Sequence, residues 1–463
     1  MADRFAEDNE LRAWTSERRR RKGEHASLSH KEPQDSSRLG SVDELAILVG
    51  AGPAMDGVGG LEELHQLALT AGARVLGEVM QRRRTPHPAT YLGSGKLAEV
   101  KELCEETGAT LVITDDDLTP AQVRNMEKVL DLRVIDRSEL IIDIFATHAG
   151  TRQARLQVEL AQLQYLAPRL KRMWTHLSRI TGAGGIGSRG PGEKQIEVDR
   201  RIIQRRIRDL KHELAEIEAR RERQARSRRN IFKVALVGYT NAGKSTLMRR
   251  LTGADVLVED KLFATLDTRT RRWAVASSLE VLLSDTVGFI DKLPHHLVAS
   301  FHATLAEVRD ADLLLHVADA GDLELERRCA VVRRVLKEIG AGEIPEVLLL
   351  NKIDILPDPV EATILARRHR AALALSARTG EGSEELSNLV RSRASAGYTR
   401  VDIELPAADG ATLSLIAREG TLISRECVAD RLRVQALVPE ALVERLTAAC
   451  LKIHGGPPKA PGG

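Results

Sequence analysis

The sequence has few aromatic residues and few cysteines, and it lacks long apolar runs. Phenylalanine, tryptophan and tyrosine make up 3% of its 463 residues, which argues against stacked aromatic platforms for single-stranded nucleic acid. The four cysteines lie far apart, without the Cys-x-x-Cys spacing of zinc sites, and are expected to be buried or idle thiols. No run approaches about 18 apolar residues, and basic residues stand at 18–22, where a secretory leader would be apolar. We therefore expect a cytoplasmic protein without a membrane span.

Length and composition are those of a multidomain globular protein. Hydrophobic residues make up 43% of the chain and charged residues 29%, which are ordinary values for a chain that builds cores. At roughly 100 to 200 residues per domain, three or four folded units are expected. The patterns along the chain predict a disordered tail (1–40), an N-terminal α/β subdomain (41–150), a helical hairpin (151–229), a mostly parallel α/β domain (230–396), a small α+β domain (397–452) and a second tail (453–463).

Positive charge is concentrated in residues 151–229. This segment has 20 lysines and arginines against 9 acidic residues, whereas the net charge of the whole chain is only +3. Such asymmetry indicates contact with a polyanion, nucleic acid first, and a solvated helical face is the alternative. Apolar residues recur at steps of four and three over 156–177 and again over 203–217, which predicts an antiparallel pair of helices. Pro168 is expected to kink or interrupt the first helix.

A glycine-rich stretch, 181–192, separates the two predicted helices. Six of its twelve residues are glycine, so its backbone can approach phosphates closely while neighbouring arginines neutralise them. A plain flexible connector is the alternative, although two antiparallel helices need only a few linking residues. The candidate RNA contacts are Arg179, Gly184, Gly185, Gly187, Arg189, Gly190, Gly192 and Lys194.

A phosphate-binding loop follows the strand predicted at 231–237. The sequence Gly-Tyr-Thr-Asn-Ala-Gly-Lys-Ser occupies 238–245, and a helical pattern follows it. Glycines let backbone N–H groups converge on phosphates, Lys244 supplies a positive charge, and the Ser245 hydroxyl is a ligand for Mg²⁺. The candidate nucleotide contacts in this loop are Gly238, Tyr239, Thr240, Asn241, Ala242, Gly243, Lys244, Ser245 and Thr246.

A second motif favours a nucleoside triphosphate with a bound metal. The apolar strand expected at 281–285 ends in Asp285, Thr286, Val287 and Gly288. This order puts a carboxylate beside the metal and a flexible glycine N–H within reach of the γ-phosphate.

Two further motifs select guanine. A strand expected at 346–350 ends in Asn351, Lys352, Ile353 and Asp354, and a later strand ends in Ser376, Ala377 and Arg378. Asp354 can accept both the N1 proton and the amino group of guanine, a donor pair that adenine lacks. Lys352 would lie along the base, and the Ala377 N–H could donate to guanine O6. A site that pairs these groups discriminates strongly against other bases.

The segment between these motifs is the expected mobile switch, with nucleotide contacts at Phe263, Ala264, Thr265, Leu266 and Asp267. Thr265 is expected to complete the Mg²⁺ shell, and Thr268 and Thr270 are alternatives that spacing cannot separate. The catalytic candidates are therefore Lys244, Thr265, Asp285 and Gly288.

Phe289 occupies the position after Gly288, where many GTPases have the glutamine that orients the attacking water. Because an apolar side chain cannot do this, hydrolysis is expected to be slow until a partner organises the water. The alternative is that His295 or His296 does so within the chain.

Two other segments have weaker signals. Gly93, Ser94, Gly95 and Lys96 open a predicted helix, where helix capping is favoured over a second nucleotide loop. Near the C-terminus, the runs 401–405, 412–420 and 431–438 look like strands, followed by a helix near 439–452.

Six motifs together resemble the HflX family of translational-factor-related GTPases over roughly 41–450: YLGSGK, the glycine-rich segment that begins at Gly182, GYTNAGKST, LFATLDT, DTVGFI and NKID. The resemblance implies Mg²⁺ as cofactor and GTP or GDP as ligand. It also implies binding to the 50S subunit, GTP-dependent splitting of stalled 70S ribosomes, and hydrolysis that the ribosome stimulates. The glycine-rich tip would contact rRNA near the peptidyl transferase centre.

The resemblance has limits and an alternative. The family form of the switch continues Asp-Pro-Thr-Thr, whereas Thr268, Arg269 and Thr270 follow Asp267 here. The alternative function is a GTP-regulated rRNA-binding factor in large-subunit assembly, without splitting. A monomer is expected, because the basic hairpin should stay free for its partner.

Overall fold

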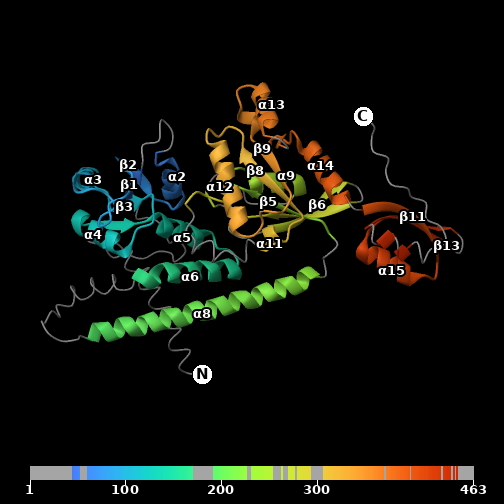
Figure 1. Ribbon diagram of the computed structural model, residues 1–463, viewed down its shortest axis with the longest axis horizontal. Coiled ribbons are helices and arrows are strands. Elements are labelled where there is room, and N and C mark those ends of the chain that lie inside the picture. The colour runs from blue at the N-terminus through green and yellow to red at the C-terminus, as the bar shows by residue number, and fades with distance from the viewer. Residues whose placement is uncertain are drawn as a thin grey trace, which may run out of the picture. The chain divides into compact units, whose positions relative to one another are not determined.

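The computed structural model describes residues 44–52, 60–169, 191–226, 231–253, 262–263, 269–276, 279–292, 306–369, 372–396, 398–428, 431–439, 442–443 and 445–446. Both expected tails lie outside these ranges. The chain divides into two compact units, 1–140 and 141–463, and each is described by itself with the labels of Figure 1. None of the described helices combines the length and apolarity needed to cross a membrane.

The first unit is a small α/β fold, as expected. Four parallel strands form a sheet in the order β2-β1-β3-β4, with β1 (Leu45–Gly52), β2 (Arg74–Arg82), β3 (Leu111–Thr114) and β4 (Arg133–Ile135). The helices α2 (Glu62–Thr70), α3 (Ser94–Thr107) and α4 (Pro120–Leu130) alternate with these strands. Thr119 and Gln122 form a reciprocal capping box that fixes the start of α4. Strand β3 is buried throughout, as interior strands of parallel sheets are.

The second unit begins within helix α5 (Arg137–His148) and continues with the expected helical hairpin. Its helices are α6 (Arg152–Leu166) and α8 (Pro191–Arg226), and a short 3₁₀ turn, η1 (Ala167–Arg169), follows α6. Pro168 lies in that turn, so the first helix ends where the proline predicted an interruption. The buried seam consists of Leu156, Leu160, Leu163, Ile203, Leu210 and Leu214.

Ion pairs confirm that α6 and α8 run antiparallel. Arg206 pairs with Glu159 at 2.8 Å, and Arg152 pairs with Glu213 at 3.3 Å. The glycine-rich stretch was expected to extend to Gly192, but α8 already begins at Pro191. Proline is favoured in the first turn of a helix, because its fixed φ suits a helix and its missing N–H has no partner there. Gly192 and Lys194 therefore belong to the helix.

The hairpin is followed by a six-stranded sheet, in the order β10-β9-β8-β5-β7-β6. Its strands are β5 (Lys233–Gly238), β6 (Arg269–Ala276), β7 (Leu279–Asp285), β8 (Leu313–Asp319), β9 (Glu346–Asn351) and β10 (Ala372–Ala374). All neighbours are parallel except β6, which pairs antiparallel with β7. The helices are α9 (Lys244–Thr252), α11 (Ala306–Arg309), α12 (Leu325–Glu338), α13 (Pro359–Arg368) and α14 (Ser383–Ser395), with the 3₁₀ turn η2 (Ile353–Ile355).

The C-terminal part contains an antiparallel sheet, β11-β13-β12, and a helix that packs against it. The strands are β11 (Tyr398–Pro406), β12 (Thr421–Val428) and β13 (Arg431–Pro439). The expectation of a strand at 412–420 was wrong, because α15 (Gly410–Glu419) covers 412–419. The Asp409 side chain accepts from the Thr412 N–H and caps this helix, and Ile416 is buried in the core of the sheet. Of the expected helix near 439–452, only 442–443 and 445–446 are described, and they are helical.

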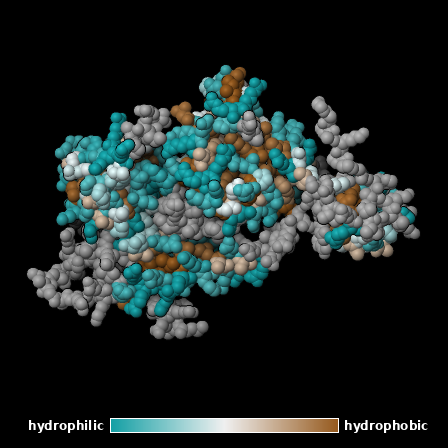
Figure 2. Space-filling model, viewed as in Figure 1, coloured by the Kyte–Doolittle hydropathy of each residue, from teal (hydrophilic) through white to brown (hydrophobic). Residues whose placement is uncertain are grey.

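The burial of side chains distinguishes an exposed apolar patch and sets the environment of the cysteines. Figure 2 shows apolar colour at α13, where Val360 and Ile364 are exposed, and Ile355 of the preceding turn η2 is exposed too. Cys104 and Cys329 are buried, and burial raises the pKa of each thiol to about 11. Cys427 is exposed, and Cys450 lies outside the described residues.

Candidate functional site

The phosphate loop connects β5 to α9, and its backbone requires glycine at two positions. Gly238 has φ of 152°, and a Cβ there would lie 2.1 Å from the Val317 carbonyl oxygen. Gly243 has φ of 93°, and a Cβ there would lie 2.3 Å from Asn351 Nδ2. Any side chain at either position would therefore collide with a neighbouring strand. These two glycines let the loop close over the carboxyl end of the sheet.

Lys244 is buried at the start of α9 and donates to its own loop. Its Nζ lies 3.1 Å from the Gly238 carbonyl oxygen and 2.8 Å from that of Tyr239. Burial lowers the pKa of Lys244 to about 8, against a raising effect of Asp285. The loop thus holds the lysine side chain in one position, with its charge shielded from solvent.

Asp285 and Ser245 form the group that fits Mg²⁺. The Ser245 hydroxyl donates to Asp285 Oδ2 at 2.6 Å. The other carboxylate oxygen, Oδ1, is buried and has no hydrogen-bond partner among the described residues. Burial raises the pKa of Asp285, although Ser245 and Lys244 act in the opposite direction. An unsatisfied carboxylate oxygen beside a hydroxyl is the type of oxygen ligand set that Mg²⁺ prefers.

The segment after Asp285 lies against the phosphate loop. Phe289 and Tyr239 form a parallel β-bridge, in which the Thr240 N–H donates to the Phe289 carbonyl at 2.8 Å and the Phe289 N–H donates to the Gly238 carbonyl at 3.1 Å. A Cβ on Gly288 would lie 3.1 Å from Lys244 Nζ. Gly288 is therefore next to the lysine, and the Phe289 side chain is buried.

At the base end, Asn351 links the guanine motif to the phosphate loop. Its Nδ2 donates to the Ala242 carbonyl at 2.8 Å, and its Oδ1 accepts from the Ala377 N–H at 2.9 Å. The expected donor to guanine O6 is thus hydrogen-bonded to Asn351 in this structure. Asp354 accepts from the Ser376 hydroxyl at 2.6 Å and pairs with Arg378 at 2.5 Å. The strand ends therefore bring all these predicted residues together.

Sequence reasoning missed Asp319, which ends β8 on the same edge of the sheet. Its Oδ2 pairs with Lys352 Nζ at 2.8 Å, and its Oδ1 accepts from the Gly321 N–H at 3.0 Å. Lys352 has φ of 66°, so its backbone is in the left-handed region. The sequence offered a way to find Asp319. It is the last residue of an apolar strand, and the C-terminal ends of parallel strands lie at the same edge of the sheet.

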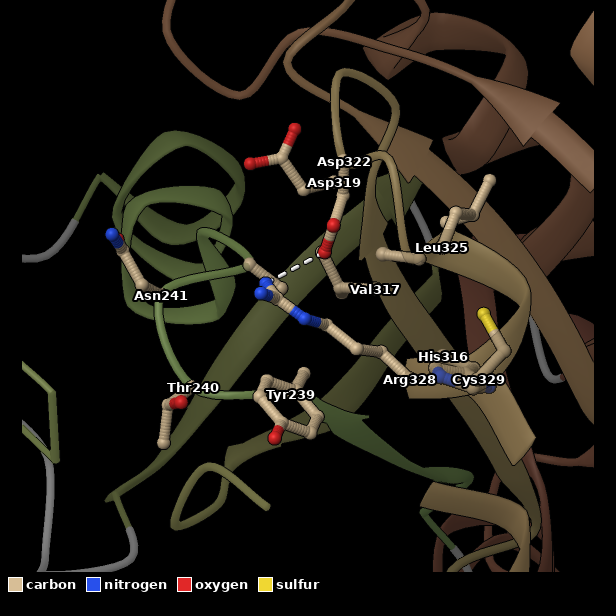
Figure 3. A pocket seen from close by; sticks show the side chains of 12 residues that line it. Tyr239, Thr240, Asn241, His316, Val317, Asp319, Asp322, Leu325, Arg328 and Cys329 are labelled. Atoms are coloured by element: carbon tan, nitrogen blue, oxygen red, sulfur yellow. Dashed lines mark ion pairs between the residues drawn. The ribbon is translucent and has the colours of Figure 1, made fainter. Parts of the chain in front are cut away.

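A small pocket of about 60 Å³ lies between the phosphate loop, the end of β8 and α12 (Figure 3). The Arg328 guanidinium lies 5.0 Å from the centre of the Tyr239 ring and pairs with Asp322 at 2.6 Å. The Tyr239 hydroxyl accepts from the Asp291 N–H at 2.7 Å, and Asp291 pairs with Arg327 at 2.9 Å. Helix α12 therefore holds both the phosphate loop and the segment after Gly288.

Other residues singled out in the sequence have different contacts or lie outside the described residues. Phe263 is buried with its ring against Phe145 of α5, and Lys96 pairs with Glu99 at 2.7 Å within α3. Outside the described residues lie Ala264, Thr265, Leu266, Asp267 and Thr268 of the expected switch, His295 and His296, and the RNA candidates Arg179, Gly184, Gly185, Gly187, Arg189 and Gly190. The roles of these residues stay predictions.

Comparison with known families gives three matches along the chain. Residues 59–146 match the model for the N-terminal part of GTP-binding GTPases, and 148–228 match the model for their middle region. Residues 233–352 match the model described as 50S ribosome-binding GTPase.

A solved structure of a GTP-binding protein from Sulfolobus solfataricus, in complex with GDP, is 25% identical in sequence. The match covers 76% of this chain and 99% of that chain, with a TM-score of 0.41.

Curated relatives are much more similar in sequence. The GTPase HflX of Lacrimispora saccharolytica is 43% identical over 412 residues, which cover 88% of this chain and 96% of that relative. The GTPase HflX of Escherichia coli is 47% identical over 353 residues, which cover 76% of this chain and 82% of that protein. With this coverage and the phosphate, metal and base elements assembled at one sheet edge, the chain belongs to the HflX family of GTPases.

Proposed function

We propose that this GTPase binds the 50S ribosomal subunit and, in its GTP form, splits stalled 70S ribosomes in the cytoplasm, and that the ribosome stimulates its GTP hydrolysis. The observation that carries the proposal is the match of residues 233–352 to the 50S ribosome-binding GTPase model. The excess of basic residues in 151–229 supports rRNA as the partner, because phosphate contacts by lysine and arginine dominate nucleic-acid affinity.

The chain's own residues give each part of GTP a binding group. Backbone N–H groups of the phosphate loop and the Lys244 ammonium hold the phosphates, while Asn351 and Asp354 orient and read the base. Ser245 would hold Mg²⁺ together with Thr265, and Asp285 would fix this group through its bond to Ser245. When bound there, Mg²⁺ would supply positive charge to offset the charge that develops on the transferring phosphoryl group. Gly288 donates its N–H to the γ-phosphate and so senses the triphosphate.

The hairpin supplies the contact with the ribosome. Helix α8 has 36 residues and is therefore about 54 Å long at the usual helical rise. Its seam against α6 buries leucines of both helices, which stiffens the base of the hairpin. The glycine-rich residues 181–190 come directly before α8 in the sequence, and we propose them as the ribosomal contact.

The test is sedimentation of purified 70S ribosomes with the protein and a nonhydrolysable GTP analogue, GDP or no nucleotide, with hydrolysis assayed on the same samples. We expect 30S and 50S peaks only with the analogue, the protein on the 50S peak, and faster hydrolysis with ribosomes than without them. Intact 70S particles with the protein bound to free 50S subunits would instead favour the assembly factor.

Two charge-matched variants test the role of the tip. Alanine at Arg179, Arg189 and Lys194 (the tip variant) removes three positive charges in and beside the glycine-rich stretch. Alanine at Arg201, Arg208 and Lys211 removes three from exposed positions farther along α8. We expect only the tip variant to lose splitting, with GTP binding intact in both. Equal losses would show that net charge, not the tip, drives the contact.

A further inference from the structure

The phosphate loop contains one buried hydroxyl that its neighbours do not use. The hydroxyls of Ser245 and Thr286 donate to Asp285 and to the Leu236 carbonyl, and the Tyr239 hydroxyl accepts from a backbone N–H. The Thr240 hydroxyl is buried and has no hydrogen-bond partner among the described residues. A buried hydroxyl without a partner costs free energy, so this one needs an explanation in the site.

Thr240 lies where the γ-phosphate contacts converge. A Cβ on Gly288 would be 2.8 Å from both Thr240 Cα and Thr240 Cγ2, and 3.1 Å from Lys244 Nζ. Thr240 is therefore beside the two groups that the triphosphate motifs aim at the γ-phosphate. In Figure 3 the Thr240 side chain lies at the edge of the pocket and points away from Arg328.

We propose that the Thr240 hydroxyl donates a hydrogen bond to a γ-phosphoryl oxygen of GTP and is a catalytic residue of hydrolysis. The proposal rests on the GTPase activity and names a contact for it. In the reaction, the oxygen of water bonds to the γ-phosphorus, and the bond to the β–γ bridging oxygen breaks with its electron pair left on GDP. Both protons of the water end on inorganic phosphate or in solvent. Thr240 keeps its own proton throughout.

A hydroxyl that binds the γ-phosphate would be useful in this site, because the glutamine that orients the attacking water in many GTPases is replaced by Phe289. Phe289 is buried and apolar, so it cannot bind the attacking water. A hydroxyl cannot act as a strong base, but a hydrogen bond to an anionic oxygen is among the stronger ones and is made only when a γ-phosphate is present. Thr240 therefore distinguishes GTP from GDP and stabilises charge on the transferring group.

The test compares Thr240→Val, which keeps the shape and removes the hydroxyl, with Thr240→Ser, which keeps the hydroxyl. Affinities for GDP and for a nonhydrolysable GTP analogue, and single-turnover hydrolysis, are measured on the full chain without ribosomes. We expect the valine variant to bind GDP within about twofold of the unchanged protein and to lose about 10-fold to 100-fold in analogue affinity and hydrolysis together. The serine variant should recover most of that loss.

Ser383→Ala is the matched control, because the Ser383 hydroxyl is also buried without a partner, at the start of α14. We expect it to leave the ratio of analogue to GDP affinity unchanged. Parallel loss of GDP and analogue affinity in Thr240→Val, or unchanged analogue binding and hydrolysis, would overturn the proposal. Because ribosomes are absent, a failure of ribosome splitting does not affect this test, and absent hydrolysis in the unchanged protein would count against the GTPase activity itself.

Discussion

Phe263 and Phe145 form an edge-to-face pair, with ring centroids 4.7 Å apart and planes at 78°. Both side chains are buried, and Phe263 has φ of 58°, a left-handed backbone that is rare for a bulky residue. Such a conformation persists where packing holds it. Phe145 of α5 therefore fixes the residue from which the expected switch segment, with Thr265, departs.

Phe145→Ala should weaken both folding and triphosphate binding. Loss of a buried phenylalanine costs about 3 kcal/mol of unfolding free energy, and Phe263 loses its support. We expect urea melts to show the destabilisation, and affinity for a GTP analogue to fall several-fold more than affinity for GDP. Leu214→Ala, in the hairpin seam, is the control, and it should lose stability without changing that preference. Equal losses for both nucleotides in Phe145→Ala would contradict the prediction.

Asp319→Ala should weaken guanine nucleotide binding through Lys352. Without its ion pair, Lys352 is free to leave the position that suits the base, which should cost about 10-fold in affinity for GDP and GTP alike. Asp322→Ala is the control, because Asp322 lies in the same turn but pairs with Arg328. Titration with a fluorescent GDP measures the nucleotide affinity of each of the two variants. The prediction is wrong if the two variants bind equally well.

Asp354→Asn should change base preference from guanine to xanthine. The carboxylate accepts the two guanine donors, whereas an asparagine amide can donate to the extra carbonyl of xanthine. We expect GTP affinity to fall by at least about 100-fold and xanthosine triphosphate to bind in its place. Ribosome splitting by this variant should then follow the xanthosine nucleotide. Retained GTP preference, measured by competition, would show that Asp354 does not read the base.

Glu346 should make stability depend on acid pH. Burial alone would raise its pKa, but hydrogen bonds with His316 and Arg333 lower it from 4.5 to about 2. Because this pKa is lower in the folded than in the unfolded chain, the stabilisation is complete above about pH 4.5 and is lost as pH falls through about 2. Glu346→Gln should lower the unfolding free energy at pH 7, and urea melts should show that gap closing toward pH 2. A gap that does not change with pH would refute this.

The strands, the hairpin and the nucleotide motifs could be predicted from sequence because each has a local signal. Periods of two or of three and four residues define the elements, and the strand ends place Lys244, Asp285 and Asn351 at one edge. The 412–420 run failed because its apolar residues fit a strand as well as a helix, and the Asp409 cap decided the outcome. The Asp319–Lys352 and Tyr239–Asp291 contacts join distant segments, so no local pattern announces them.

Strands β6 and β7 give the nucleotide site a common anchor. Arg269, the first residue of β6, pairs opposite Asp285, the last residue of β7. The segment that contains Thr265 therefore enters the sheet at the same rung from which the Gly288 segment leaves it. A displacement of this residue pair would therefore move both segments together. A γ-phosphate that contacts one of the two segments would thus also change the position of the other, through the Arg269–Asp285 pair.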